Sequence, residues 1–454
     1  MPLQKNQVLT LQVERLSSDG SGVAHSPEGE TVFIPGAAPG DEARVRIVKD
    51  CKRYAFGILD EVLTPSPDRI PVDCAVAGPC GGCSLRHLDY AAELRAKQEN
   101  VADAFARIGG LDVPVLPIVG SPEIDRYRNK VQFPVGTDKA GRPCIGFYAG
   151  RTHRIVPCPD CRLQPGVLNE IGNTLCAFFA EKGIHPYNEE TGKGLVRHIF
   201  LRRGAHSGQI MVCLVCTRAK LPSADELCTR LKEAFPDIVT ILLNVNAKST
   251  NVILGSETHT LYGQGYIEDT LCGVPVQLGP LSFYQVNTLQ AEKLYGIAKE
   301  YAELKGNETL LDLYCGAGTI GLSMAGSVKK LVGVEIIPEA VENAKHNAEL
   351  NNIKNAEFFC GDAGEIASKL NEKPDVIIID PPRKGCDTAT LDAIINMSPE
   401  KVVMISCNPS TAGRDCNYFE QNGYKVRKVR AVDLFPRTSH VECVVLMSRV
   451  NPEK

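Results

Sequence analysis

The sequence predicts a multi-domain protein with an N-terminal β-barrel, a mixed α+β central domain and a C-terminal doubly wound α/β domain. Its 454 residues correspond to about three domains at about 150 residues each. Short apolar strand patterns fill the first 65 residues, and strands alternate regularly with helical stretches after Leu310. A chain that is 43% hydrophobic with a net charge of −4 is folded, and it does not bind nucleic acid by bulk charge.

The pattern of residues 1–65 predicts an OB-like barrel, because several short strands are separated by turn signals such as Pro39-Gly40-Asp41. Pro65 and Pro67 then break the strand pattern. The expected strands are Val8–Val13, Thr31–Gly36, Glu42–Val48 and Phe56–Val62.

Residues 66–275 are expected to form the central domain, which opens with a Cys/Gly cluster between Cys74 and Cys83. Residues 90–110 contain an amphipathic helix that Gly109-Gly110 stops, and we expect this helix to pack on the C-terminal domain. The C-terminal domain, 276–454, has a βαβ rhythm that predicts a doubly wound, Rossmann-like and mainly parallel sheet.

A nucleotide site is predicted where strands of this sheet end. A loop with Gly316, Gly318 and Gly321 follows the first strand, and Glu335 ends the next strand about 20 residues later. Asp362 and Asp380 follow two further strands. These glycines also fit NAD, but a carboxylate at Asp312 would repel a pyrophosphate, and it suits the cationic end of S-adenosyl-L-methionine.

A nucleophile and a base are predicted near the same cleft. Cys407 follows the fifth strand, where a thiolate could act as nucleophile or a thiol could simply pack. Alternation along the last strand places His440 and Glu442 on one face. Glu442 is a candidate general base or a solvated edge carboxylate, and His440 is expected to be structural.

A thiolate metal site is predicted from Cys74, Cys80 and Cys83, which stand close together with glycines between them. The N-terminus has no secretory h-region, so we expect reduced cysteines and a cytoplasmic protein. Cys158 and Cys161 are both candidates for a fourth ligand. An iron–sulfur cluster, a zinc ion and free buried thiols all remain open on this pattern.

Three segments together resemble the RNA uracil-C5 methyltransferase family, and the resemblance covers nearly the whole chain. They are Ser282–Asn287, Asp380–Gly385 and the run from Cys407 to Glu442. The resemblance implies that Cys407 is the nucleophile and Glu442 the base. It implies that S-adenosyl-L-methionine is contacted by Gln285, Tyr314, Glu335, Asp362 and Asp380, and that a [4Fe–4S] cluster is held by Cys74, Cys80, Cys83 and Cys161.

The first 65 residues resemble a TRAM domain, an RNA-binding barrel, in Gly20–Ala24 and Phe33–Ala37. Two aromatic residues, Tyr54 and Phe56, could stack on bases. Three basic stretches are candidate phosphate contacts or solvated faces: Arg44, Arg46, Lys49, Lys52 and Arg53; then Arg126, Arg128 and Lys130, expected along one strand; then Arg197, His198, Arg202 and Arg203.

These expectations combine into an enzyme that methylates uracil C5 in 23S rRNA through a covalent Cys407–C6 adduct, on a single-stranded or flipped uridine. The alternatives are a tRNA enzyme and an inactive RNA-binding iron–sulfur protein. The resemblance favours rRNA, since tRNA enzymes of the family typically lack both the TRAM module and the cysteine cluster. DNA cytosine methylation is disfavoured because Cys407 follows serine, where those enzymes have proline. We expect a monomer that needs no membrane and no obligate protein partner.

Overall fold

The computed structural model describes residues 3–150, 152–370 and 373–450. It divides into two compact units. The first contains the chain up to Ala77, residues 82–124 and residues from Asp380 onward, and the second contains residues 78–81 and 125–379. Within the described chain, no helix has the length and apolar character needed to cross a bilayer.

The N-terminal strands close into a barrel in the order β1-β2-β3-β5-β4, which confirms the predicted OB-like fold. Alternation explains the closure, since Ala43, Val45 and Ile47 of β4 point inward and are fully buried. The sequence pattern missed β2, because it is short and directly follows the Gly20–Gly22 turn signal. The strands are β1 (Val8–Leu16), β2 (Gly22–His25), β3 (Thr31–Ile34), β4 (Glu42–Asp50) and β5 (Tyr54–Thr64).

The rest of the first unit is built on an antiparallel β-ribbon, in which β22 lies between β20 and β21, and β6 runs parallel to β21. Helix α1 starts at the cap Asp89, and a π-helical turn at Ala104–Ile108 packs on α9. The elements are α1 (Tyr90–Asp103), β6 (Val115–Val119), α8 (Thr388–Met397), β20 (Lys401–Ser406), α9 (Pro409–Gln421), β21 (Tyr424–Val432) and β22 (Glu442–Arg449).

A buried ionic network ties α1 to the loop between β21 and β22. The Lys97 ammonium donates to Glu93 and to Asp433, at 2.7 Å each. Asp433 also accepts from the Tyr90 hydroxyl at 2.8 Å, and Glu93 accepts from the backbone N–H of Arg437 at 2.8 Å. These bonds hold the loop that leads into Glu442.

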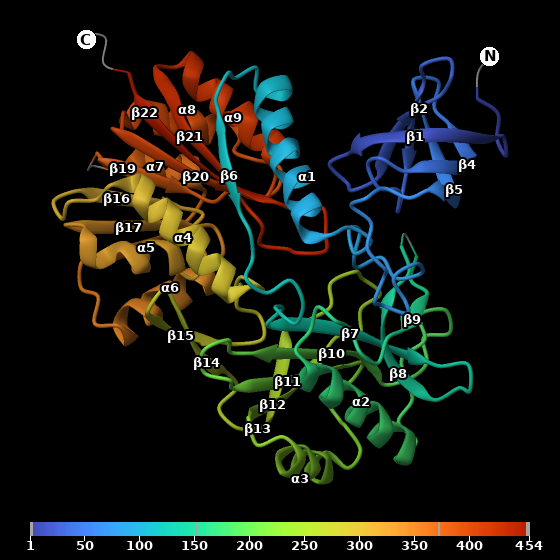
Figure 1. The fold of residues 1–454 in the computed structure, drawn as a ribbon. Coiled ribbons are helices and arrows are strands. Elements are labelled where there is room, and N and C mark those ends of the chain that lie inside the picture. The colour runs from blue at the N-terminus through green and yellow to red at the C-terminus, as the bar shows by residue number, and fades with distance from the viewer. Residues whose placement is uncertain (1–2, 151, 371–372, 451–454) are drawn as a thin grey trace. The chain divides into compact units, whose positions relative to one another are not determined.

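The second unit begins with a seven-stranded sheet, in the order β13-β12-β11-β10-β7-β8-β9 (Figure 1). One face packs on helices α2 and α3 around residues such as Phe133 and Leu214. This is the predicted mixed α+β arrangement. Its elements are β7 (Lys130–Thr137), β8 (Pro143–Tyr148), β9 (Ile155–Pro157), α2 (Gly166–Glu181), β10 (Val196–Arg203), β11 (Ile210–Cys216), α3 (Ala224–Ala234), β12 (Ile238–Val245) and β13 (Glu257–Tyr262).

The second unit continues with parallel strands in the order β18-β17-β16-β19. The apolar runs of β16 and β19 are buried, as expected when helices flank a parallel sheet. This part carries the predicted βαβ fold. Its elements are β14 (Ile267–Leu271), β15 (Val274–Leu278), α4 (Thr288–Ala302), β16 (Thr309–Leu313), α5 (Thr319–Met324), η2 (Ala325–Ser327), β17 (Lys330–Glu335), α6 (Pro338–Leu350), β18 (Ala356–Cys360), α7 (Ala363–Lys369) and β19 (Val376–Ile379).

Replacing Lys97 by methionine should lower the free energy of unfolding by about 3–5 kcal/mol, because it leaves Glu93 and Asp433 as buried carboxylates without their cation. Urea denaturation followed by circular dichroism measures this. Lys425→Met, which breaks the exposed pair with Glu420, is the control and should cost less than about 1 kcal/mol. Equal losses in the two variants would contradict the role given to Lys97.

Candidate active site

The predicted nucleophile and base meet at one end of the antiparallel ribbon. Ser406 of β20 pairs with Cys443 of β22. The next position on each strand is therefore Cys407 and Glu442, which stand side by side where β20 ends and β22 begins. Asp380 follows β19 directly in the sequence but belongs to the first unit, as Cys407 and Glu442 do. It is close enough to both side chains to raise their pKa values.

Burial makes this site unfavourable for negative charge. Glu442 is only 4% exposed, and its burial, with Asp380 nearby, raises the pKa of its carboxyl to about 8. Burial likewise raises the pKa of Asp380 to about 7. Burial, and then the carboxylates of Glu442 and Asp380, raise the pKa of the Cys407 thiol. Without a ligand and near neutral pH, Glu442, Asp380 and Cys407 therefore carry less negative charge together than the same three side chains would carry in water.

Arg383 opposes this trend. Its side chain hydrogen-bonds Cys407, and its charge lowers the pKa of both the Cys407 thiol and the Glu442 carboxyl. The loop that presents it is held at its backbone, because the Arg383 carbonyl accepts from the Asn408 amide at 2.9 Å. Sequence reasoning included Arg383 only as part of a motif, and its position directly after Asp380-Pro381-Pro382 was the available signal.

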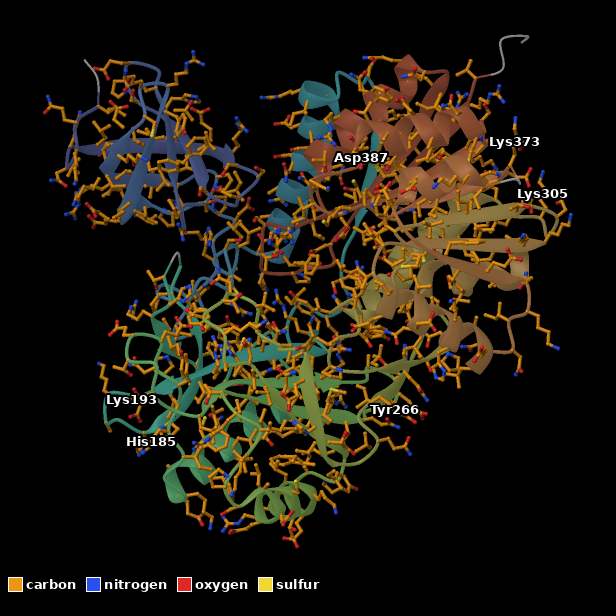
Figure 2. The ribbon with its side chains drawn as sticks, turned by 180° about the vertical axis from the view of Figure 1, so that it is seen from behind. His185, Lys193, Tyr266, Lys305, Lys373 and Asp387 are labelled. Atoms are coloured by element: carbon orange, nitrogen blue, oxygen red, sulfur yellow. The ribbon has the colours of Figure 1, made fainter. Side chains whose placement is uncertain are left out.

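The end of this loop is anchored by a helix cap. Gly385 has φ of +78°, and a Cβ there would lie 2.5 Å from the Arg414 guanidinium. Asp387, labelled in Figure 2, caps α8 by accepting from the Thr390 N–H at 2.8 Å. The loop from Asp380 to Asp387 is thus fixed at both its turn and its end.

His440 lies outside the strand that carries Glu442, because β22 begins only at Glu442. The strand alternation on which the sequence prediction rested therefore does not extend back to His440. His440 is exposed, and its ring contacts Phe435 edge-on at 6.0 Å. The preceding loop turns at Arg437, which has φ of +70°.

The predicted glycine loop in the second unit has an open side and a packed side. Gly316 has φ of +55°, and a Cβ there would meet no atom within 4 Å. A Cβ at Gly318 would lie 3.1 Å from the side chains of Ala344 and Phe358. A Cβ at Gly321 would lie 2.8 Å from the carboxylate of Asp312. Gly316 therefore leaves space for a ligand, whereas the other two permit close packing.

Glu335 ends β17 beside this loop, as predicted. Its carboxylate accepts from the N–H groups of Gly316 at 3.1 Å and Ile337 at 2.9 Å. Tyr314 is half-buried within the loop and has φ of +63°. Asp362 is exposed and caps α7, accepting from Gly364 at 3.0 Å and Glu365 at 3.1 Å. The structure thus gives Asp362 a capping role that the sequence prediction did not include.

Gln285 lies in the same unit, and its half-buried side-chain amide has no hydrogen-bond partner among the described residues. Its backbone carbonyl accepts from the Asn129 amide at 2.7 Å. A groove of about 550 Å³ runs nearby, and its lining includes Phe283, Ala317 of the glycine loop and Ile337 after Glu335. That volume lies within the range of small-molecule sites.

The structure does not show the predicted [4Fe–4S] site. Among the described residues, no group of three or more His, Cys, Asp or Glu side chains is arranged to hold a metal ion. The four cysteines belong to different units: Cys74 and Cys83 to the first, and Cys80 and Cys161 to the second. A hydrogen bond from Cys158, against the opposing effect of burial, lowers the pKa of Cys161 to about 6.

The basic stretches differ in how they are paired. In the barrel, Arg44 pairs with Glu61 at 2.7 Å and Arg46 with Asp60 at 2.8 Å. Within the described part of the chain, Lys49, Lys52 and Arg53 remain as the cations of that stretch without an ion pair. Three aromatic side chains cluster on the same barrel with centroids 5.7–5.9 Å apart: Phe33, Tyr54 and Phe56.

In the second unit, Arg126 does not lie on a strand with Lys130, because β7 begins only at Lys130 and Arg126 has φ of +60°. Its guanidinium instead pairs with Asp160 at 2.6 Å and bonds the Cys161 carbonyl at 2.9 Å. Arg197 is likewise part of the fold, since it donates to two backbone carbonyls, those of Asn246 and Lys248.

Comparison with known proteins places both ends of the chain in described families. Residues 258–450 match the family model described as tRNA (Uracil-5-)-methyltransferase, and residues 2–59 match the TRAM domain. The chain is 44% identical to an uncharacterized RNA methyltransferase of Bacillus cereus, covering 99% of this chain and 98% of the relative. It is 41% identical to another from Clostridium tetani, covering 100% and 99% respectively.

Among solved structures, the chain resembles the tRNA (uracil-54, C5)-methyltransferase of Pyrococcus abyssi in complex with S-adenosyl-L-homocysteine. The TM-score is 0.79 and the sequence identity is 28%. The match covers 97% of this chain and 100% of that one, so the two proteins share their architecture from end to end.

Replacing Arg383 by glutamine should move the alkylation of Cys407 by iodoacetamide to higher pH, because Arg383 lowers the pKa of that thiol. Peptide mass spectrometry measures the rate at Cys407 across a pH series, without RNA or cofactor. Lys384→Gln removes an equal charge from the exposed neighbouring position and should leave the profile in place. Identical shifts in both variants would show only a general charge effect.

Proposed function

The chain belongs to the RNA uracil-5-methyltransferase family, which depends on S-adenosyl-L-methionine, and we propose that it methylates uracil C5 in 23S rRNA. The observation that carries the proposal is the juxtaposition of Cys407 and Glu442 at adjoining strand ends, with Asp380 and Arg383 beside them. A thiol and a buried carboxylate supply the nucleophile and the base that covalent methylation of a pyrimidine needs beside a methyl donor.

Cys407 is proposed as the nucleophile. Uracil C5 is a weak carbon nucleophile until its ring is activated. Addition of the Cys407 thiolate to C6 breaks the C5–C6 double bond and moves the electron pair toward C5 and the O4 carbonyl as an enolate. The Arg383 side chain stabilises the thiolate before attack by donating a hydrogen bond to it. Because the target base must reach this site, it is taken from a single-stranded or flipped position.

Glu442 is proposed as the base that removes the C5 proton after C5 has gained its methyl group. The C5–H electron pair then restores the C5–C6 double bond, and the sulfur of Cys407 leaves C6 with its own pair. A carboxyl group whose pKa is about 8 holds an abstracted proton far better than an ordinary carboxyl group does near neutral pH. Its burial is therefore suited to the role.

The second unit fits S-adenosyl-L-methionine, which supplies an electrophilic methyl group when it is bound. The space at Gly316 would accommodate a ligand against the backbone. Gln285, Tyr314, Glu335, Asp362 and Asp380 are proposed to hold it. The free amide of Gln285 and the position of Glu335 at a strand end support this assignment.

A second candidate substrate is tRNA. The observation that favours it is the end-to-end match to a tRNA enzyme, which shows that this architecture also serves that substrate in a relative. Because that match also spans the barrel, the barrel does not distinguish the two substrates, and the cysteine cluster, by the family resemblance, supports rRNA as the first choice. In either case the enzyme would work in the cytoplasm, without a membrane or an obligate partner.

We further propose that Cys74, Cys80, Cys83 and Cys161 ligate a [4Fe–4S] cluster, with a four-thiolate zinc site as the alternative. The lowered pKa of Cys161 supports a thiolate at that position. The methylation chemistry uses no electrons, so the cluster would be structural. Protein purified anaerobically should absorb broadly near about 400 nm and contain acid-labile sulfide. Zinc without sulfide would decide for the alternative, and metal-free active protein would refute both.

Cells that lack the protein should lose 5-methyluridine at one or more sites of 23S rRNA, because we propose that this protein forms the modification there. Mapping modified uridines by mass spectrometry of RNase fragments measures this. Wild-type protein should restore the sites, and Cys407→Ala should not, although it should bind cofactor normally. If all rRNA sites persist while a tRNA site disappears, the substrate is tRNA.

Glu442→Gln is the matched variant, because it keeps the nucleophile and removes the base. With RNA and cofactor it should accumulate a covalent RNA–protein adduct that survives a denaturing gel, and Cys407→Ala should form none. If Glu442→Gln forms no adduct, Glu442 is not the base, and the proposed role of Cys407 as nucleophile is unaffected.

A further inference from the structure

A group of cations in the second unit has no carboxylate partner among the residues that the structure describes. Lys130, the first residue of β7, lies directly opposite Arg202 of β10 in the antiparallel register. Arg128 stands two residues before Lys130. Burial, and then the charges of Arg202 and Arg128, lower the pKa of the Lys130 ammonium to about 8. Like charges placed opposite each other on neighbouring strands destabilise a sheet.

The hydrogen bonds of these side chains do not neutralise them. Arg202 is 1% exposed and donates to the backbone carbonyls of Gly279 at 2.8 Å and Ser282 at 2.7 Å. The Nε atoms of Arg202 and Arg128 are buried without a partner. The half-buried Lys130 makes no hydrogen bond or ion pair with any residue that the structure describes. Buried charge is costly unless an opposite charge meets it.

Two other arginines of this unit do have carboxylate partners. Arg126 pairs with Asp160, and Arg230 pairs with both Glu181 and Glu226. The group at Lys130 differs from these pairs because its cations face one another.

The cations also lie beside the segment that carries Gln285. Asn129, between Arg128 and Lys130, donates to the Gln285 carbonyl at 2.7 Å and to the Thr288 hydroxyl at 2.9 Å. Arg202 holds the same segment at its start, through Gly279 and Ser282. An anion at Lys130 would therefore sit next to the proposed cofactor-contacting residue.

We propose that Lys130, with Arg202 and Arg128 around it, binds a backbone phosphate of the RNA substrate next to the target nucleotide. This rests on the proposed function, and it assigns a substrate contact to Lys130. A phosphate fits better than the carboxylate of the cofactor's methionine end. That end carries an ammonium of its own, which three cations would repel, whereas a phosphodiester has only negative charge.

The test compares Lys130→Gln with Lys139→Gln, which removes an equal charge from an exposed position in the turn after β7. The probes are a fluorescein-labelled 23S rRNA fragment that contains the methylated uridine and a short oligouridylate. Anisotropy is measured over a series of KCl concentrations. Lys130→Gln should bind the rRNA fragment about tenfold more weakly, and its log–log salt slope should fall in magnitude by about one. Lys139→Gln should match wild type, and Lys130→Arg should recover most of the affinity.

Calorimetric titration with S-adenosyl-L-methionine should give the wild-type affinity for Lys130→Gln, which also shows that the variant is folded. Unchanged RNA affinity and salt slope would overturn the proposal. So would weaker cofactor binding with normal RNA binding, because the cations would then serve the cofactor's carboxylate. If wild-type protein binds the probes but methylates no rRNA, the proposed substrate fails, and the Lys130 comparison is repeated with the tRNA that it methylates.

Discussion

The fold of the first unit depends on a lysine ammonium buried between two carboxylates. Lys97 joins Glu93 of its own helix to Asp433, which is far away in the sequence, with bonds of 2.7 Å. Because a buried charge tolerates little displacement from its partners, this network fixes the helix against the loop that follows β21. That loop delivers Glu442 to the start of β22, so the position of the proposed base follows from the ion pair.

The site itself uses charge in the opposite way. Two carboxyl groups and a thiol lie near one guanidinium. Burial and then Asp380 raise the pKa of Glu442, and burial and then both carboxylates raise the pKa of the Cys407 thiol. The surroundings favour a different protonation state at each group. Arg383 favours the deprotonated thiolate of Cys407, whereas burial lets the Glu442 carboxylate accept a proton near neutral pH. The same principle, applied to cations without an anion, distinguishes Lys130 from the paired arginines of its domain.

Much of this was accessible from local patterns. Glycine spacing after a strand predicted the open loop at Gly316, and the position of Glu335 followed from the next strand. Patterns failed where a turn interrupts a strand. The sequence pattern of Arg126 and of His440 suggested that each residue extends a neighbouring strand. In the structure a backbone turn with positive φ precedes each strand, at Arg126 itself in one case and at Arg437 in the other. Alternation has no meaning before the first residue of a strand.

Local sequence patterns were enough to predict the barrel, the βαβ order and the candidate reactive side chains, because periodicity and strand-end motifs are local properties. Which strands adjoin is visible only in the folded chain, where the pairing of Ser406 with Cys443 brings Cys407 beside Glu442. It also decided the burial that raises the pKa of Glu442 to about 8. Register and burial arise from contacts between distant segments, and no local pattern encodes them.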